Sequence, residues 1–374
     1  MRIKAVEPIA VSLPMKKPVK MAGETVSRAD NVLVRIEAND GSVGWGEAAS
    51  APTMTGETVA GMMAAVEYLT TALLQRAADD FDGAAAAMDA AMYGNSAAKA
   101  AIEIALHDLV GRATGRPVHV LLGAKLRERI PLLAVIGSLD AAADVRDAQE
   151  RRRAGYVMFK IKVGLAAPEA DAARTRAICA ALGADCVVSA DANQGWSADQ
   201  AVGYVQDVAG SGLAFFEQPV PAYDLAGMAR VAAAAGPIAI GADEGIHGRE
   251  DIERHHARGA ARGVSLKAIK LGGARAVVAA GRLCDRLGMQ VNISCKTGES
   301  SIASAAALHA AAVIPVIAWG LTVTSPGLAE DLVAEPLRVD GGHLDVLDRP
   351  GLGVEVDERR VRRWQRAFAA RKVA

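Results

Sequence analysis

The sequence predicts an α/β protein in which parallel strands alternate with helices. Between Met158 and Lys270 it contains five apolar runs of about four to six residues, a length and composition typical of buried strands. An Ala-rich, helix-compatible segment separates each run from the next. Strand–helix alternation gives parallel strands joined by right-handed crossovers, so all five carboxyl ends are expected on one face.

Charged residues stand at the end of every one of these runs. In chain order the runs end at Lys160 and Lys162, at Asp191, at Glu217, at Asp243 and Glu244, and at Lys267. In barrel enzymes the carboxyl ends of the strands carry the active site. We therefore expect these acids and lysines to converge around one site.

Three of the strand-end acids, Asp191, Glu217 and Asp243, are the predicted metal ligands. Clustered carboxylates repel one another unless a cation lies among them. A hard divalent ion with oxygen ligands suits them, Mg²⁺ above all, with Mn²⁺ as the substitute. A single strand-end acid is more often a solvated group or a helix cap, but three at equivalent positions in successive units favour a metal site.

The ordered motifs resemble a known family. They are Lys160-Ile161-Lys162, Asp191-Ala192-Asn193, Glu217-Gln218-Pro219, Asp243-Glu244 and Lys267-Ala268-Ile269-Lys270-Leu271-Gly272-Gly273. In this order they resemble the enolase superfamily, and more narrowly its muconate-lactonizing enzyme (muconate cycloisomerase-like) subgroup, over essentially the whole chain. The resemblance implies a TIM-type (β/α)8 barrel or a modified (β/α)7β barrel with an α+β capping domain.

The remainder of the chain is assigned around this barrel. Residues 1–125 are expected to form the N-terminal part of the α+β capping domain, residues 126–325 the catalytic barrel, and residues 326–374 a segment that returns to the cap. Within the cap, the resemblance assigns two loops, 15–27 and 49–57, to closure over the barrel mouth. The eighth barrel strand is predicted at 313–319, after a seventh at 289–295.

The chemistry expected of this site is removal of a proton α to a substrate carboxylate, through a metal-stabilised enediolate. Lys162 is the predicted base, and Lys160 lies on the same face of the strand as its electrostatic partner. The base must be neutral near pH 7, and positive neighbours and partial burial lower a lysine pKa. Lys267 is expected across the barrel, where a second lysine permits racemisation or epimerisation.

Five further residues are predicted as substrate or second-shell contacts: Asn193, Glu244, Lys270, Glu299 and Trp319. Asn193 is expected to hydrogen-bond the ligands. Glu244 is expected to point to the opposite face of its strand and pair with a lysine. Glu299 matches a polar site residue of the resembled subgroup, or belongs to a helix cap. Trp319 faces either a substrate group or the core.

Two sequence features typical of other groups in the resembled superfamily are missing, which narrows the reactions expected of this protein. The mandelate racemase subgroup uses a histidine at the end of the seventh strand, and the sequence has no histidine from Leu287 to Ser301. Dipeptide epimerases hold a substrate ammonium with an Asp-x-Asp pair, where this sequence has Thr322-Val323-Thr324. A free α-ammonium would lack that clamp.

Composition excludes several other classes. The formal net charge of −1 gives no reason to expect nucleic acid or a membrane surface, and Arg151-Arg152-Arg153 is interpreted as a solvated face. The most apolar stretch, 302–319, contains His309 and Pro315 and is not expected to span a membrane. Four cysteines without a C-x-x-C pair, and an N-terminus unlike a signal peptide, favour a cytoplasmic protein with free thiols.

The leading hypothesis is a Mg²⁺-dependent racemase or epimerase of an amino-acid derivative, acting on a small carboxylate. A muconate-type cycloisomerase and a dehydratase of a hydroxy acid such as a hydroxyproline are the alternatives within the same chemistry. A non-catalytic barrel that binds a metabolite is the alternative from another class, and stabilisation by Mg²⁺ discriminates it. The resemblance also implies a homo-oligomer.

Overall fold

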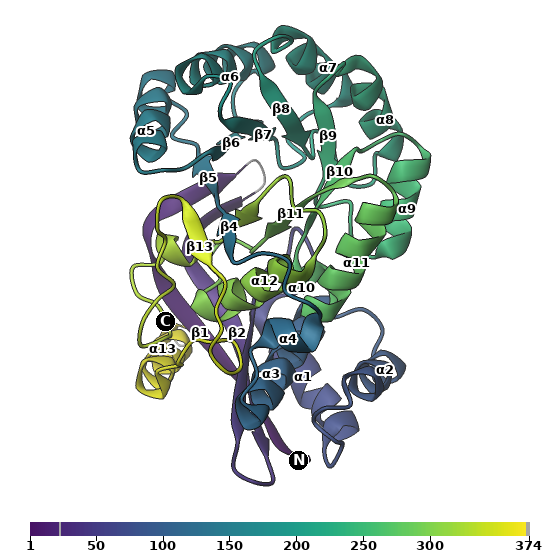
Figure 1. The fold of residues 1–374 in the computed structure, drawn as a ribbon, viewed down its shortest axis with the longest axis vertical. Helices are drawn as coiled ribbons and strands as arrows, with labels where there is room; N and C mark the ends of the chain where they lie inside the picture. Colours follow the sequence, from purple (N-terminus) through teal and green to yellow (C-terminus); the bar gives the residue numbers. More distant parts are fainter. Residues whose placement is uncertain (22–23, 372–374) are drawn as a thin grey trace.

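The structure is a computed structural model that describes residues 1–21 and 24–371. A three-stranded antiparallel sheet, a barrel of parallel strands and the helices around them make up the molecule (Figure 1). No helix in these described ranges is long and apolar enough to cross a membrane.

The cap begins with a sheet of strand order β1-β2-β3. Its strands are β1 (Ile3–Met21), β2 (Glu24–Ala38) and β3 (Val43–Ala49). β1 and β2 extend through most of segment 15–27, which is therefore paired strand and not a loop, and its residues 22–23 lie outside the described residues. The backbone pairs Val19 with Val26, beyond an irregularity that starts at Pro14, and so continues the hairpin over the barrel.

Two helices cover this sheet, α1 (Val59–Leu73) and α3 (Ser96–Thr114), and α2 (Phe81–Ala91) packs on both of them. The buried helix α3 lies directly against β3. Two glycines make this close approach possible, because a Cβ on Gly44 would stand 2.3 Å from the carbonyl oxygen of Ala105, and one on Gly46 1.9 Å from that of Ala101. Helix α3 ends at Thr114, and the next residue, Gly115, adopts the left-handed conformation with φ of 68°.

The barrel consists of eight parallel strands in the order β12-β11-β10-β9-β8-β7-β6-β5. They are β5 (Leu133–Ile136), β6 (Met158–Lys162), β7 (Val187–Asp191), β8 (Leu213–Glu217), β9 (Ala239–Ala242), β10 (Gly263–Leu266), β11 (Gln290–Ser294) and β12 (Leu321–Thr322). The five predicted charged strands are confirmed. The eighth strand is not at 313–319, because helix α12 continues to Val313 and the strand begins only after Gly320.

Helices follow seven of these strands. They are α5 (Ala141–Arg153), α6 (Pro168–Leu182), α7 (Ala198–Asp207), α8 (Leu225–Ala234), α9 (Arg249–Ala257), α10 (Ala268–Leu271) with α11 (Ala274–Arg286), and α12 (Ser301–Val313). β12 is followed instead by a single 3-10 turn, η1 (Ser325–Gly327). The barrel is therefore of the (β/α)7β type.

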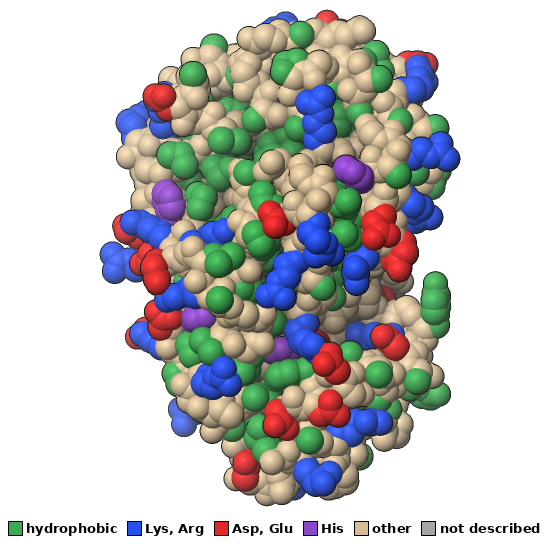
Figure 2. Space-filling model, turned by 45° about the vertical axis from the view of Figure 1, so that its right-hand side comes forward, with side chains coloured by type: hydrophobic (Ala, Val, Ile, Leu, Met, Phe, Trp, Pro, Cys, Tyr) green, Lys and Arg blue, Asp and Glu red, His purple; other side chains and the backbone are tan. Residues whose placement is uncertain are grey.

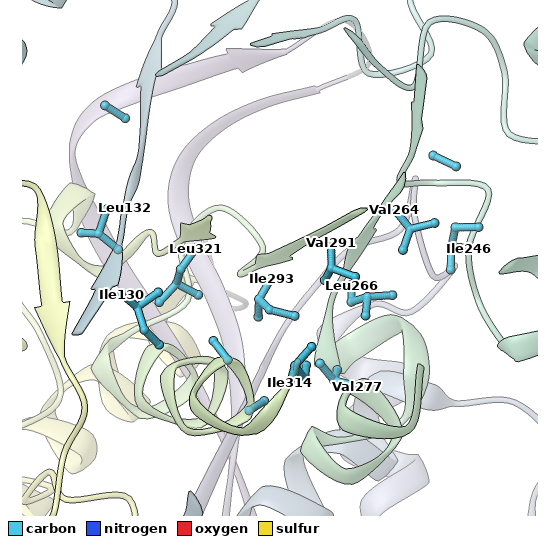
Figure 3. Packing of buried hydrophobic residues seen from close by; sticks show 14 of the residues in the cluster. Ile130, Leu132, Ile246, Val264, Leu266, Val277, Val291, Ile293, Ile314 and Leu321 are labelled. Carbon is cyan, nitrogen blue, oxygen red and sulfur yellow. The ribbon is translucent and has the colours of Figure 1, made fainter. Parts of the chain in front are cut away.

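The ring of strands is nearly closed. Between β12 and β5 the described residues form a single bridge, Leu132 with Leu321, in place of a ladder. Figure 3 shows these two leucines near Ile130, in the apolar layer between the strands and the surrounding helices. Inside the barrel floor, Trp319 stacks on Phe215 with ring centroids 4.0 Å apart.

The chain after the barrel returns to both parts of the fold. Helix α4 (Val118–Leu122) and strand β4 (Arg129–Pro131) connect cap and barrel, and β4 pairs with β13 (His343–Asp345). The final helix α13 (Glu358–Arg371) packs on β1 of the cap (Figure 1). On the face shown in Figure 2, acidic and basic side chains are interspersed, as the small net charge predicts.

Candidate active site

Strand register brings the predicted residues to one level. Lys162 of β6 is the pairing partner of Asp191 of β7, and Asp191 is the partner of Glu217 of β8. Asp243 and Lys267 each come one residue after their strands, β9 and β10. The parallel alternation predicted from the apolar runs is thus sufficient to assemble all five groups at the barrel mouth.

Lysines and acids alternate around this mouth. Lys160 forms an ion pair with Glu217 and lies 4.0 Å from Asp191. Lys162 donates hydrogen bonds to Asp191 and to Asn193, both of 2.7 Å. On the other side, Lys267 donates to Asp243. Each acid of the predicted metal set therefore contacts a lysine ammonium.

The two lysines proposed for proton transfer stand on opposite walls. Lys162 ends β6 and Lys267 follows β10, and three strands separate β6 from β10 in either direction around the ring. Met54, from the segment after β3, lies with its sulfur 3.9 Å from the Lys267 ammonium. The cap thus reaches the second lysine.

Burial and charge set the ionisation of these groups in opposite directions. Burial alone would raise the pKa of Asp191, but the ammonium groups of Lys162 and Lys160 outweigh it and hold that pKa below its ordinary value. Burial raises the pKa of Glu217, and repulsion from Asp191 and Asp243 adds to the increase. Burial disfavours the Lys267 ammonium, yet attraction to Asp243 prevails and raises the pKa of Lys267.

Backbone strain gathers just after the acids. Asn193, Gln194 and Gln218 adopt positive φ angles of 42°, 67° and 34°, which non-glycine residues rarely do. Their side chains hold the site: Asn193 Nδ2 donates to Glu244, and Gln218 Oε1 accepts from the backbone N–H of Asp243 at 2.8 Å. Such strain is typical of functional sites, where the surrounding structure maintains it.

The donor set fits a hard divalent cation. The three predicted ligands are fully buried carboxylates, and Oε2 of the neighbouring Glu244 accepts no hydrogen bond from the described residues. Within that same part of the chain no three acidic, histidine or cysteine side chains already form a metal cage, because the lysine ammonium groups pair with the acids. A divalent cation bound among Asp191, Glu217 and Asp243 would neutralise carboxylate charge that these lysine ammonium groups now neutralise.

A cavity of about 620 Å³ opens above these groups. Lys160, Lys162, Asp191, Asp243 and Lys267 line its inner end. Its walls continue along β5 and over residues 17–20 of the cap hairpin. Its size is that of a small-molecule site.

The remaining predicted contacts are distributed differently. Asn193 is beside the base, as expected. Glu244 does not point to the opposite face, because β9 ends at Ala242 and strand alternation no longer applies; it lines the cavity, and burial raises its pKa to about 7. Lys270 is fully buried and donates to Asp243 Oδ1 at 2.6 Å.

Glu299 and Trp319 lie outside the large cavity. Glu299 accepts from the backbone N–H of Lys296 at 2.8 Å, and the neighbouring Ser300 caps α12. Burial and repulsion from Glu47 raise the pKa of Glu299 to about 8. Trp319 packs on Phe215 in the barrel floor, so of its two expected positions it occupies the core and does not face the cavity.

Two residues at or near the site were not predicted from the sequence. Ser265 donates to Glu217 at 2.9 Å, and its inward position on β10 follows from strand alternation. Arg151 was interpreted as part of a solvated face, yet it lines the cavity whereas Arg152 and Arg153 are exposed. An isolated arginine run contains no signal that separates its inward member from the others.

Comparisons with known proteins agree with this geometry. Residues 5–123 match the family model "Mandelate racemase / muconate lactonizing enzyme, N-terminal domain", and residues 143–360 match "Enolase C-terminal domain-like". A chloromuconate cycloisomerase of Cupriavidus necator is 32% identical over 98% of this chain and 100% of its own length. An L-Ala-D/L-Glu epimerase of Clostridium acetobutylicum is 32% identical over 92% and 96%.

Solved structures show the same likeness. The muconate lactonizing enzyme of Pseudomonas fluorescens, complexed with muconolactone, superposes with a TM-score of 0.92 at 31% identity, covering 97% of this chain and 99% of that one. An N-succinyl Arg/Lys racemase of Bacillus cereus gives a TM-score of 0.92 at 27% identity, covering 97% and 98%. These relatives are isomerases. The chain therefore belongs to the enolase superfamily, in its muconate-lactonizing enzyme-like subgroup.

Proposed function

We propose that this enzyme abstracts the proton α to the carboxylate of an amino-acid derivative and returns it to the opposite face, as a racemase or epimerase. The observation that supports this most directly is the position of two lysines, the partly buried Lys162 and the buried Lys267, on opposite barrel walls, each paired with an acid. A planar intermediate between them is accessible from both sides.

The residues have separate roles in this proposal. Lys162 removes the proton from one face and Lys267 donates one to the other, while Lys160 balances the charge of Glu217. Asp191, Glu217 and Asp243 would hold Mg²⁺, or Mn²⁺ in its place. The bound ion supplies positive charge next to the substrate carboxylate, which stabilises the negative charge that proton removal creates. Asn193 fixes Lys162 through its 2.7 Å hydrogen bond.

The cavity wall favours an acylated or otherwise neutral α-nitrogen. Thr322 and Thr324 line the cavity where the resembled dipeptide epimerases have an acidic pair, so no carboxylate is present at these positions to bind an ammonium. The 27% identity with the N-succinyl Arg/Lys racemase over nearly the whole chain agrees with such a substrate.

Cycloisomerisation of a muconate is the second candidate. It is favoured by the 32% identity over nearly full length with the chloromuconate cycloisomerase. It requires one lysine to exchange a proton with an enediolate, and Lys162 alone suffices for that step. The role of Lys267 therefore separates the two candidates.

Proton NMR in D₂O tests both. The enzyme with Mg²⁺ is incubated with N-acylated amino acids, proline and hydroxyproline derivatives, and cis,cis-muconate. We expect an α-proton signal to disappear with inversion of the centre, and the loss to stop with EDTA or in Lys162→Ala. Lys4→Ala, which removes an exposed lysine of the cap, is the matched control. Binding without exchange or product, unaffected by EDTA, would contradict proton abstraction for these acids.

A cytoplasmic homo-oligomer stays our prediction for the state of the protein. Light scattering on the purified full chain measures the number of copies.

A further inference from the structure

A buried cluster of three charged side chains lies behind the part of the barrel wall that carries Lys162. Arg174 on α6 donates through Nη1 to Asp144 on α5 at 2.6 Å, and through Nη2 to Asp171 on its own helix at 2.7 Å. These three side chains, which we call the triad, are at most 4% exposed. They do not line the cavity, so any effect on a substrate has to pass through other residues.

Arg174 is bonded to the backbone of the predicted base. Its Nη2 also donates to the carbonyl oxygen of Lys162 at 2.5 Å, at the residue where β6 ends. Burial disfavours the guanidinium, but the hydrogen bonds and charges of Asp171 and Asp144 outweigh it and raise the pKa of Arg174. Because the donors of an arginine form a rigid planar fork, the two acids fix the guanidinium and the guanidinium fixes the Lys162 carbonyl.

Asp144 connects the triad to the stem of the Lys162 side chain. Its Oδ1 accepts hydrogen bonds from the backbone N–H and the hydroxyl of Ser138, at 2.8 and 2.7 Å. The residue before Ser138 is Gly137, and a Cβ at Gly137 would stand 3.0 Å from the Cβ and 3.3 Å from the Cγ of Lys162. By fixing Ser138, Asp144 therefore fixes the backbone against which the Lys162 stem packs.

Asp171 connects the triad to the surroundings of the Lys162 ammonium group. Its Oδ2 accepts from the backbone N–H of Gly164 at 2.9 Å, in the loop after β6. Gly164 has a φ of 92°, and a Cβ there would stand 2.6 Å from the carbonyl oxygen of Ala192. Ala192 lies between the two residues that accept hydrogen bonds from the Lys162 ammonium group. The triad thus contacts or supports the backbone, the stem and the ammonium environment of one lysine.

The lysine on the opposite wall is held in a different way. Lys267 directly precedes α10, and its carbonyl oxygen accepts the backbone N–H groups of Lys270 and Leu271 at 3.1 and 3.2 Å. Its ammonium group pairs with Asp243. These contacts do not involve the triad. A change in the triad should therefore displace Lys162 and leave Lys267 in place.

We infer that Arg174 is a positioning residue for the base: with Asp144 and Asp171 it sets the place of Lys162 relative to the substrate, on one face of the reaction only. Replacement of a buried ion cluster by neutral residues often leaves stability unchanged, so stability alone does not account for such a cluster. A displacement of about 1 Å at a reacting group reduces a rate about a hundredfold. The inference rests on the proposed function for the role of Lys162 as base.

Proton exchange of separate enantiomers measures the two lysines one at a time. The L and D forms of N-acetyl amino acids are incubated in D₂O with Mg²⁺, and the form whose exchange is lost in Lys162→Ala reports on Lys162. In Arg174→Gln this rate should fall about a hundredfold, and the rate of the other form should stay within about twofold. Arg112→Gln is the matched control, because Arg112 in the cap likewise bonds two acids and a backbone carbonyl oxygen. It should leave the ratio of the two rates unchanged.

A second variant covers the case in which Arg174→Gln does not fold. Arg174→Met combined with Asp144→Asn and Asp171→Asn leaves no charge of the triad buried and unpaired, so this protein should fold and show the same loss on one face. Carbon-13 NMR of reductively dimethylated lysines needs no substrate. The Lys162 signal, assigned with Lys162→Arg, should shift in both variants, and the Lys267 signal should not.

Three results in a folded variant would overturn the positioning role of Arg174: equal slowing of both enantiomers, slowing of neither, or a Lys162 signal that does not move. If no N-acetyl amino acid exchanges with the unchanged protein, the proposed function fails for these acids, and the lysine signals alone decide the inference. A shifted Lys162 signal beside an unchanged Lys267 signal then supports the positioning role, and equal shifts of both signals contradict it.

Discussion

Two groups of buried acids differ in what satisfies them. In the cap, Glu47 accepts hydrogen bonds from the backbone N–H groups of Ser300 and Ala303 at the start of α12, from the Ser300 hydroxyl and from Asn31. Glu103 likewise accepts from the first two N–H groups of α11. At the barrel mouth, Glu217 pairs with the Lys160 ammonium, and Glu244 keeps one oxygen without a donor among the described residues.

The hydrogen-bond partners of these buried acids distinguish a structural role from a chemical role, which burial alone does not. Backbone N–H groups at a helix start are fixed partners, so Glu47 and Glu103 join the cap to the barrel and require nothing else. Lysine ammonium groups are movable partners, and a buried carboxylate with an unsatisfied oxygen is costly unless a ligand completes it. Acids of the first kind should control stability, and groups of the second kind should control chemistry.

The largest expected effect separates chemistry from stability. Lys162→Ala should reduce α-proton exchange at least about a thousandfold, since positioned general bases contribute on this scale. The free energy of unfolding should change little, because Asp191 keeps its second lysine, Lys160. Exchange rates by NMR and denaturant unfolding measure the two. A Lys162→Ala protein that is destabilised but still exchanges the α-proton would contradict the assignment of Lys162 to chemistry.

The opposite outcome is expected in the cap. Glu47→Ala should lower the free energy of unfolding by on the order of 3 kcal/mol, because the N–H groups of α12 and the Ser300 hydroxyl lose their acceptor in a buried place. The folded fraction should retain exchange. Denaturant titration checks this, with Glu37→Ala, a partly exposed acid on the neighbouring strand, as the control. Equal free energies of unfolding of Glu47→Ala and Glu37→Ala would contradict the structural role assigned to Glu47.

The stabilisation of the protein by Mg²⁺ is expected to depend on the barrel-mouth acids and not on the cap acids. Magnesium at a hundredfold excess over its dissociation constant should stabilise the protein by about 2.7 kcal/mol. Glu217→Gln should lose most of this gain, whereas Glu103→Gln should start from a less stable protein and keep it. Thermal unfolding with and without Mg²⁺ measures both. A gain that persists in Glu217→Gln would place the ion elsewhere.

The positions of the barrel-mouth acids and lysines could be predicted from the sequence. The partners of the cap acids could not, and the reasons are physical. Parallel topology and strand register fix where Lys162, Asp191 and Glu217 meet, so the strand-end pattern was sufficient. Glu244 was placed on the wrong face because strand alternation stops with β9 at Ala242. Long-range partners such as Ser300 for Glu47, and the inward turn of Arg151, depend on packing between segments far apart in the chain.

A last expected effect concerns the pH dependence of stability. Burial and repulsion from Glu47 raise the pKa of Glu299 to about 8, against an ordinary value of 4.5. The folded protein therefore binds a proton more tightly than the unfolded chain between these values, and this contribution to stability is lost as pH rises from about 5 to 8. Glu299→Gln should remove the part of the slope that Glu299 contributes, which is at most about 1.4 kcal/mol per pH unit. Denaturant titrations of the unchanged protein and of Glu299→Gln at pH 5, 6.5 and 8 measure this difference. Parallel pH profiles of the free energy of unfolding for these two proteins would mean that Glu299 is already ionised in its buried position. The distinction between the two groups of buried acids would then not extend to Glu299.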